Sequence, residues 1–373
     1  MIRFCQECIL PDTRPNLEIG EDGVCNACSA HRTKPSIDWR GRKEAFQEVV
    51  QHASSRTDRY DCVIPVSGGK DSTWQVVKCL EFGLTPLAVT WRPPGRTEIG
   101  QRNLDNLVQL GVDHIDYQIN PSLERRFIRK TFERYGSTAI PMHLAIFNIP
   151  RAIAVRFDIP LIVWGENSAF EYGGAEEERS GFLLNEEWIR RYGVTNGTTA
   201  TDWINEGFTI RELAAYFGPT SAELSVAGTR GVFLGYYFQW DPAETAAIAE
   251  AHGFQRRSEG ARTGYYAYAD IDDTFISVHH WMKWYKFGFT RLFDNLSLEI
   301  RNGRMSREDA VSILAESDEQ RPVQDIAALA QFVGWSIEEF MECAEQFRNR
   351  SIWVHEAGGW RIPGHIVPDH WWR

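Results

Sequence analysis

Short apolar stretches alternate with longer amphipathic segments through the first half of the chain. Brief apolar runs are typical of strands buried on both faces, whereas apolar residues spaced three or four apart are typical of helices. The expected strands are 62–66, 86–91, 114–119 and 161–164. The expected helices are 42–52, 73–82, 101–110, 123–135 and 144–157, the last with a break or kink at Pro150. This alternation predicts an α/β fold with a doubly wound parallel sheet.

The pattern loosens between 168 and about 230, where Gly and Thr are frequent and Glu176-Glu177-Glu178 forms an acidic run. We expect an inserted loop-and-helix region or lid there, with the acidic run as solvated surface. The apolar segment 232–240 indicates a strand or a buried stretch, and Asp241-Pro242 opens a helix that ends near Gly253. Two short helices are expected after the capping boxes Ser306-x-x-Asp309 and Ser336-x-x-Glu339.

A compact run, Ser67-Gly68-Gly69-Lys70-Asp71-Ser72, lies between the expected strand 62–66 and the expected helix 73–82. We name it the glycine turn. A strand, a glycine-rich turn and a helix N-terminus direct backbone N–H groups at a phosphate, and Lys70 adds a positive charge. The run is not a Walker A loop, which requires Gly where Ile64 stands and Ser or Thr where Asp71 stands. A plain turn is the alternative, but the flanking Ser and Asp residues favour phosphate binding.

Four of the seven cysteines form two Cys-x-x-Cys pairs, Cys5 with Cys8 and Cys25 with Cys28. Such pairs beside turn-forming residues are typical of tetrahedral thiolate zinc sites. A closed four-cysteine site leaves no open position for substrate, so we expect a structural Zn²⁺, with a redox or iron–sulfur centre as the alternative. The remaining cysteines are expected to be small buried hydrophobic residues: Cys62, Cys79 and Cys343.

Composition narrows the class of protein. The 373 residues carry a formal net charge of −11, which argues against a nucleic-acid-coating protein. No run approaches the roughly 18 apolar residues of a membrane span, and the N-terminus lacks the apolar segment of a secretory signal. We therefore expect a soluble, cytoplasmic protein. Its expected parts are a zinc knuckle at 1–38, an ATP-binding α/β domain at 39–240 with an insertion at about 168–230, and a mainly helical substrate or partner region at 241–373.

Ligands of parallel sheets bind at the carboxyl ends of the strands. The glycine turn, Thr90-Trp91-Arg92 and Gly165-Glu166-Asn167 all follow expected strands, so we expect them to meet in one cleft.

A second cationic set lies in the aromatic and basic stretch 279–291. Lys283 and Lys286 share a helix face at this spacing, and Arg291 follows them. We expect the set to meet the α-phosphate of ATP or the anionic groups of a sugar. A solvated basic face beside core aromatics is the alternative. Of the adjacent His279 and His280, at most one is expected to face the site.

Several further short motifs accompany the cysteine pairs and the glycine turn. They are Pro11-Asp12-Thr13-Arg14-Pro15, Asn148-Ile149-Pro150, Trp164-Gly165-Glu166-Asn167-Ser168, Glu171-Tyr172-Gly173-Gly174, Tyr268-Ala269-Asp270-Ile271-Asp272-Asp273 and Asp294-Asn295-Leu296-Ser297-Leu298-Glu299. In this order they resemble the N-acetyl sugar amidotransferase family of surface-polysaccharide and lipopolysaccharide O-antigen biosynthesis. The glycine turn resembles the PP-loop of the ATP pyrophosphatase superfamily, whose fold is similar to that of the adenine nucleotide alpha hydrolases.

The resemblance implies conversion of an acetamido group to an acetamidino group on a nucleotide-linked N-acetyl sugar. AMP would be transferred from ATP to the acetamido oxygen, pyrophosphate would leave, and ammonia would then displace AMP. ATP, Mg²⁺ and a structural Zn²⁺ are the expected cofactors.

The expected roles fall into three groups. ATP is expected to contact Ser67, Gly68, Gly69, Lys70, Asp71, Ser72, Thr90, Trp91 and Gly165. Catalysis is expected to use Lys70, Asp71, Lys283, Lys286 and Arg291. The sugar substrate is expected to contact Arg92, Glu166, Asn167 and His280. For Asp71, the options are orienting Mg²⁺, orienting the turn, or capping the helix.

The chain lacks the features of a glutaminase. Such an enzyme needs an N-terminal catalytic Cys, or a Gly-x-Cys-x-Gly elbow with His and Glu partners. Residue 2 is Ile, and none of the seven cysteines has glycine at both flanking offsets. Free ammonium or a tunnel from a partner must therefore supply ammonia. The resemblance implies a separate glutaminase subunit, with a cyclase-like barrel subunit as its conduit.

Two other functions compete with this interpretation. A PP-loop tRNA thiolation enzyme would adenylate a base carbonyl, but it would need a basic RNA-binding surface or cysteines near the cleft. A non-enzymatic zinc-knuckle protein with a degenerate nucleotide fold is the second alternative, and the intact glycine turn argues against it.

Overall fold

The computed structural model describes residues 2–175, 181 and 183–367. Its central sheet has five parallel strands in the order β3-β2-β1-β4-β5. The strands are β1 (Cys62–Pro65), β2 (Pro86–Trp91), β3 (Asp113–Tyr117), β4 (Leu161–Trp164) and β5 (Arg230–Phe233). The strand order reverses between β1 and β4, which confirms the predicted doubly wound parallel sheet. The acidic run 176–178 lies outside the described residues.

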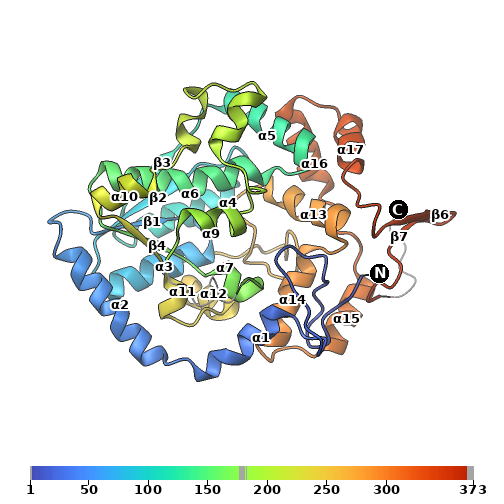
Figure 1. The fold of residues 1–373 in the computed structure, drawn as a ribbon, viewed down its shortest axis with the longest axis horizontal. Helices are drawn as coiled ribbons and strands as arrows, with labels where there is room; N and C mark the ends of the chain where they lie inside the picture. The colour runs from blue at the N-terminus through green and yellow to red at the C-terminus, as the bar shows by residue number, and fades with distance from the viewer. Residues whose placement is uncertain (1, 176–180, 182, 368–373) are drawn as a thin grey trace.

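Helices cover both faces of the sheet (Figure 1). Val63, Val89 and Ile162 point into one core, formed with α5 (Pro121–Tyr135) and α6 (Ala139–Arg156). The alternate positions Ile64, Ala88 and Val163 point into the other core. That core is formed with α2 (Trp39–Ser54), α3 (Lys70–Glu81) and α4 (Glu98–Val108). Burial on both faces explains why these strands are continuous apolar runs in the sequence.

All five helices predicted in this part of the chain begin two to five residues earlier in the structure, and two of the differences bear on the site. α3 begins at Lys70, not at Thr73, so half of the glycine turn is the first turn of the helix. α6 continues through Pro150 without a break. A proline inside a helix removes the hydrogen bond to the carbonyl four residues earlier, here that of Ile146. The helix tolerates this loss because Phe147 and Ile153 anchor it in the core on either side of Pro150.

The insertion after β4 contains short helical elements, as predicted. They are α7 (Ser168–Tyr172), α9 (Glu186–Tyr192), η2 (Ala200–Glu206), η3 (Glu212–Tyr216) and α10 (Ser221–Ala227). The apolar segment 232–240 is divided between the end of β5 and the short helix α11 (Leu234–Tyr237). Asp241 caps α12 (Pro242–Ala251) through its side chain, as the sequence predicts.

The C-terminal part is mainly helical and lies beside the sheet (Figure 1). Its helices are α13 (Ile276–Phe287), α14 (Arg291–Arg301), α15 (Arg307–Glu316), α16 (Val323–Val333) and α17 (Ile337–Glu345). Ser306 and Ser336 cap α15 and α17, which confirms both predicted starts, whereas α16 was not predicted. A hairpin of β6 (Val354–Glu356) and β7 (Gly359–Arg361) follows.

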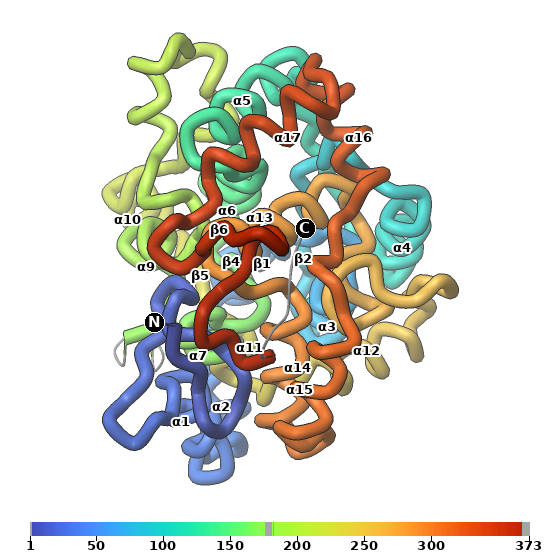
Figure 2. The backbone as a smooth tube through the Cα atoms, turned by 90° about the vertical axis from the view of Figure 1, so that its right-hand side faces the viewer, coloured from blue at the N-terminus to red at the C-terminus, as the bar shows by residue number. Residues whose placement is uncertain are grey.

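The N-terminal cysteine segment packs against this helical part, although the two are far apart in the sequence (Figure 2). The Ile9 N–H donates to the Ser297 hydroxyl on α14 at 3.4 Å, and the Arg307 guanidinium on α15 donates to the Cys8 carbonyl at 3.1 Å. A helix, α1 (Asn26–Thr33), begins directly after Cys25, contains Cys28 and contacts α7. Among the described residues, no helix has the length and apolar character needed to cross a membrane.

Candidate nucleotide-binding site

The glycine turn lies directly after β1, at the point where the strand order reverses. Gly68 has a φ of +86°, which favours glycine, and a Cβ there would lie 2.8 Å from the Leu104 backbone nitrogen. The Ser67 N–H donates to the Ser72 hydroxyl at 2.9 Å and closes the turn. Gly69 is the N-cap of α3, so the unpaired N–H groups of the helix start lie in this turn.

Replacing Gly68 by Ala should destabilise the protein by about 2 kcal/mol or more, because a strained φ and an overlap with the α4 backbone both add cost. Gly69→Ala is the matched control, since its Cβ would meet only the Ser67 hydroxyl at 3.2 Å. Urea unfolding of the two variants measures the difference. Equal midpoints for both variants would contradict the strained geometry assigned to Gly68.

Lys70 and Asp71 form a close ion pair in the first turn of α3. The Lys70 ammonium lies 2.6 Å from both carboxylate oxygens, and its side chain is 7% exposed. Asp71 also accepts from the Trp240 indole at 2.9 Å and from the Thr245 hydroxyl at 3.3 Å. The capping option for Asp71 is wrong because Gly69 occupies the N-cap. Asp71 instead fixes the direction of the Lys70 ammonium.

Two adjoining cavities open around the turn. The glycine-turn cavity, of about 180 Å³, is lined by every residue of the turn except Gly68 and by residues from the C-terminal part. The apolar cavity, of about 430 Å³, is lined by Val66, Trp91, Ile146 and Trp164, among others. The two cavities share six lining residues: Ser67, Asp71, Ser72, Glu166, Asp270 and Asp272. A polar chamber joined to an apolar one suits a nucleotide whose base and phosphates need different surroundings.

The segment from Tyr266 to Asp272 forms the wall opposite the glycine turn, and none of its residues was predicted as a site residue. It docks on the start of α4, where the Thr97 hydroxyl donates to the Ile271 carbonyl and the Thr97 N–H donates to the Asp272 carbonyl at 3.2 Å. A Cβ on Gly100 would lie 2.6 Å from the Asp272 Cα, so glycine permits this approach. The acidic run after the tyrosines, Asp270-Ile271-Asp272-Asp273, was the feature of the sequence that could have indicated site residues here.

Asp270 is the centre of a charged network in this wall. Its carboxylate lies 3.4 Å from the Arg291 guanidinium and 3.2 Å from His280 Nε2, and it accepts from the Thr263 hydroxyl at 2.9 Å. Burial alone would raise the pKa of Asp270, but His280 and Arg291 together hold it below its usual range. Asp270 also has a φ of +54°, a strained conformation for a residue with a side chain. The network keeps the Arg291 charge at the glycine-turn cavity.

The other sequence-predicted residues divide into two groups. Trp91, Gly165 and Glu166 line the apolar cavity. Burial, followed by the charge of Asp71, raises the pKa of Glu166 to about 7. Apart from Lys283 and Lys286, which line a third cavity, four candidates outside the glycine turn line neither cavity: Thr90, Arg92, Asn167 and His280.

The contacts of these four residues explain why they lie outside both cavities. Thr90 is buried and bonds His114 Nε2 at 2.9 Å, while Arg92 is half exposed and lies 3.6 Å from Asp116. Asn167 caps α7 with its side chain. His280 is buried behind Asp270 and contacts the site only through that carboxylate. These contacts direct the four side chains away from both cavities.

Glu124 lies under the apolar cavity and accepts a hydrogen bond from the Trp91 indole at 2.8 Å. Burial raises the pKa of Glu124 to about 7, although the bond from Trp91 opposes this. A carboxyl group whose pKa is raised in the folded protein favours folding below its pKa in the unfolded chain, 4.5. This contribution to the free energy of unfolding is lost as pH rises through about 7.

Glu124→Gln should therefore remove a pH-dependent part of the free energy of unfolding. This part amounts to up to about 3 kcal/mol, because one pKa unit corresponds to about 1.4 kcal/mol. The wild type should lose stability relative to this variant as pH rises between 4.5 and about 7. Urea unfolding at both ends of this range measures the change. Glu133→Gln, on the exposed face of the same helix, should leave the profile of the wild type unchanged. Parallel profiles for Glu124→Gln and the wild type would contradict the assignment.

Lys283 and Lys286 share a face of α13, as predicted, but that face lines a different cavity from the glycine turn. This basic cavity has a volume of about 390 Å³ and also contains His279. Neither lysine lines the glycine-turn cavity, so the predicted contact with the α-phosphate of ATP does not agree with the geometry. The solvated-face alternative is also wrong, because both side chains are largely buried and burial lowers the pKa of each to about 8.

The four cysteines lie together in a buried group. All four Sγ atoms lie within 4.8 Å of one another, with 3.9 Å between Cys5 and Cys28 and 3.7 Å between Cys8 and Cys25. Tetrahedral zinc with Zn–S bonds of about 2.3 Å separates its sulfurs by roughly 3.8 Å. The N–H of Cys25 also points at the Cys5 sulfur at 3.2 Å. The donor set therefore fits a closed, structural Zn²⁺ site.

The predicted burial of the other cysteines is confirmed for Cys62 and Cys79, and Cys343 is partly exposed. In the described part of the chain, no cysteine lines the glycine-turn, apolar or basic cavity.

Residues 259–364 match the family model described as LPS biosynthesis protein WbpG-like, C-terminal domain. This segment of the chain is similar to that family. It includes Asp270, Asp272 and Arg291, which line the glycine-turn cavity. The match supports the resemblance to the N-acetyl sugar amidotransferases of surface-polysaccharide synthesis.

No curated protein matches the chain. A solved structure of NMN synthetase from Francisella tularensis aligns with 84% of this chain and 97% of its own, at 11% identity and a TM-score of 0.34. The assignment of the fold rests on the strand order and on the glycine turn of the chain itself.

Proposed function

We propose that this protein is an ATP-dependent, AMP-forming amidotransferase of lipopolysaccharide biosynthesis that acts on a nucleotide-linked N-acetyl sugar. The observation that carries the proposal is the composition of the glycine-turn cavity. One wall is the turn between β1 and α3, and the opposite wall comes from the segment that matches the WbpG-like family. The predicted phosphate-binding turn and the segment that matches the family therefore line one cavity.

The reaction divides into two balanced steps. The acetamido oxygen attacks the α-phosphorus of ATP, the bond to the β-phosphate oxygen breaks, and pyrophosphate leaves. Ammonia then adds to the carbon of the adenylated imidate, and loss of AMP with the former amide oxygen gives the acetamidine. An amide is a poor electrophile, and adenylation supplies the leaving group that it lacks.

The residues of the site have distinct roles in this scheme. The N–H groups at the start of α3 and the Lys70 ammonium bind the departing pyrophosphate, where negative charge develops. Arg291, held by Asp270, adds a second cation on the opposite wall. The apolar cavity binds adenine against Trp91 and Trp164.

Asp71 and Glu166 fit a role in binding Mg²⁺. Both line the junction of the two cavities, and the charge of Asp71 contributes to the raised pKa of Glu166, so a cation between them would relieve an unfavourable pair. Mg²⁺ is usually held by one or two carboxylates together with substrate phosphates, and it would neutralise charge on the triphosphate.

Ammonia must come from outside this chain, because the sequence lacks a glutaminase nucleophile. We propose that a separate glutaminase subunit supplies it, with a cyclase-like barrel subunit as conduit. The tRNA thiolation alternative is less compatible with the site. In the described residues no cysteine lines the glycine-turn, apolar or basic cavity, and the net charge of the chain is −11.

The test is incubation with ATP, Mg²⁺, ammonium and a panel of nucleotide-linked N-acetyl sugars. The proposal predicts AMP and pyrophosphate only when a suitable sugar is present, together with replacement of its acetamido oxygen by NH in the mass spectrum. Formation of ADP, or AMP release that does not depend on any sugar, would contradict it. Lys78→Ala serves as a control protein, because Lys78 lies on the outer side of α3 and pairs with Glu81 at 2.7 Å.

A further inference from the structure

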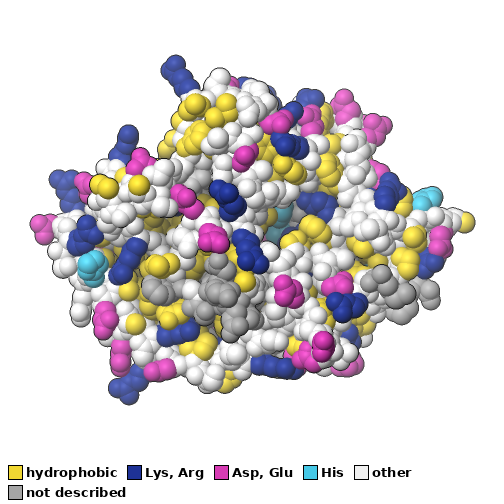
Figure 3. Space-filling view, in the orientation of Figure 1, with side chains coloured by type: hydrophobic (Ala, Val, Ile, Leu, Met, Phe, Trp, Pro, Cys, Tyr) yellow, Lys and Arg dark blue, Asp and Glu magenta, His cyan; other side chains and the backbone are white. Residues whose placement is uncertain are grey.

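The basic cavity combines an excess of positive charge with a size suited to a small ligand. Its volume is about 390 Å³, within the range of small-molecule sites. Five cationic side chains line it: Arg14, Arg190, Arg191, Lys283 and Lys286. No Asp or Glu lines it among the described residues. In Figure 3, Lys and Arg side chains surround a hollow between α9 and α13.

The charges of these cations are only partly balanced within the described chain. Asp294 is fully buried and accepts from Arg14 at 2.9 Å and from Lys283 at 3.2 Å. Its remaining contact is with Arg291 at 3.6 Å. The single negative charge of Asp294 is thus shared among three cations.

The other three cations form no close ion pair with a carboxylate of the described residues, although Asp202, whose pKa is lowered first by the Thr199 N–H, also interacts with the charge of Arg190. Lys286 donates to the carbonyls of Tyr135 and Gly136 at 3.3 and 3.2 Å, at the C-terminal end of α5. Arg190 and Arg191, from the last turn of α9, form no described ion pair. Burial, with the charge of Lys283, lowers the pKa of Lys286 to about 8, as expected for a cation that lacks a counter-charge. A ligand with several negative charges would supply it.

The basic cavity also adjoins the glycine-turn cavity. Tyr172 lines both, and Asp294 links Lys283 in the first to Arg291 in the second. Aromatic and hydroxyl side chains complete the basic cavity: Tyr192, Phe287, Phe289, Ser137, Ser168 and Thr195. Such a lining offers stacking surface and hydrogen bonds beside the charges. A ligand anchored here by its anionic part can extend past Tyr172 to the α-phosphate of ATP.

We infer that the basic cavity binds the diphosphate of the nucleotide-linked sugar, with Arg190, Arg191 and Lys286 as its main contacts. This inference rests on the proposed function for the identity of the sugar, but the binding of a diphosphate can be tested without any turnover. It assigns the two lysines of α13 to the acceptor and leaves Lys70 to the leaving group. Phosphates bound by several cations lose much of their affinity when two of these are removed.

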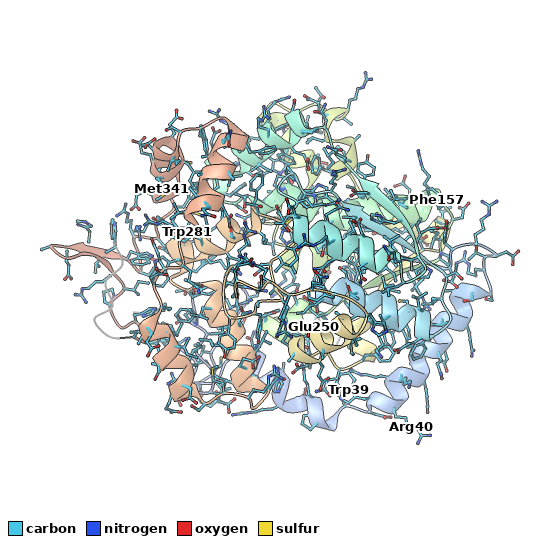
Figure 4. The ribbon with its side chains drawn as sticks, turned by 180° about the vertical axis from the view of Figure 1, so that it is seen from behind. Trp39, Arg40, Phe157, Glu250, Trp281 and Met341 are labelled. Carbon is cyan, nitrogen blue, oxygen red and sulfur yellow. The ribbon has the colours of Figure 1, made fainter. Side chains whose placement is uncertain are left out.

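The probe is inorganic pyrophosphate, titrated by calorimetry into protein saturated with α,β-methylene-ATP, which occupies the ATP site. We expect binding to the wild type, displacement of pyrophosphate by UDP-N-acetylglucosamine, and at least a tenfold weaker affinity in the double variant Arg190→Ala/Arg191→Ala. Arg40→Ala is the control, since Arg40 is an exposed arginine at the outer edge of α2 (Figure 4). It should bind pyrophosphate as the wild type does.

Three results would overturn the inference: no binding to the wild type, equal affinity in the double variant and in Arg40→Ala, or pyrophosphate binding that UDP-N-acetylglucosamine does not displace. The affinity for α,β-methylene-ATP should be equal in all three proteins, which shows that the variants fold. If the protein releases AMP with a sugar but does not bind pyrophosphate in the basic cavity, the assignment of that cavity is wrong and the proposed reaction stands. Binding without AMP release would support the cavity and contradict the proposed reaction.

Discussion

Replacing Lys70 by Ala should lower the rate of AMP formation by about 10²- to 10³-fold, the usual effect of removing one preorganised donor from a developing charge. Lys70 is the cation nearest the backbone N–H groups of the glycine turn, and Asp71 holds its ammonium in place at 2.6 Å. The loss should fall mainly on kcat, because negative charge on pyrophosphate increases as the bond to the α-phosphorus breaks. Steady-state assays of AMP at saturating ATP measure it.

Lys78→Ala is the matched control for this prediction. It removes a lysine from the same helix, and within the described residues it loses the ion pair with Glu81. The control should retain the kcat of the wild type and should unfold at a similar urea concentration. If Lys70→Ala keeps the rate of AMP formation seen in Lys78→Ala, the glycine turn does not bind the leaving group.

Replacing Cys8 by Ser should remove the bound zinc and lower the stability of the protein by several kcal/mol. The free energy of binding at a structural zinc site is also free energy of folding, and the knuckle has little core of its own. Cys8 is fully buried, and its carbonyl accepts a hydrogen bond from Arg307 on α15. Because α14 carries Arg291 and Asp294, loosening of the knuckle should also weaken the site.

Metal analysis and thermal unfolding together measure this effect. Cys343→Ser is the control, because Cys343 is a partly exposed cysteine outside the cluster. It should retain one zinc per chain and the unfolding temperature of the wild type. A Cys8→Ser protein that keeps both properties would contradict the structural role of the cluster.

The sequence was most informative where the physical pattern is local. β2 and β4 begin and end at the predicted residues, because strands buried on both faces are uninterrupted apolar runs. The start of α3 was predicted three residues late, since its first turn consists of Lys70, Asp71 and Ser72, which have no apolar periodicity. α16 was missed because no capping residue marks its start, which follows Pro322.

Only the wall of the candidate site that is formed by the ends of the strands could be predicted from the sequence. The glycine turn and Glu166 follow strands, so their meeting at the edge of the sheet follows from topology. Asp270 and Asp272 lie in an aperiodic segment, and only its docking on α4 brings them to the turn.

The residues of the second predicted cationic set lie in two different cavities for a similar reason. Gly288 ends α13 with a φ of +71° and redirects the chain, so Lys286 and Arg291 line different cavities. Likewise His279 faces the basic cavity, whereas the adjacent His280 faces Asp270. The sequence gives the spacing of such residues but not the direction in which a chain turns after a helix.

The most direct test of adenylation follows the acetamido oxygen. A nucleotide-linked sugar that reacts in the panel is prepared with ¹⁸O in its acetamido carbonyl and incubated with ATP, Mg²⁺ and ammonium. Transfer of AMP to that oxygen predicts that the label appears in the phosphate group of AMP and that pyrophosphate stays unlabelled. Label in water or in inorganic phosphate, with AMP unlabelled, would contradict the account.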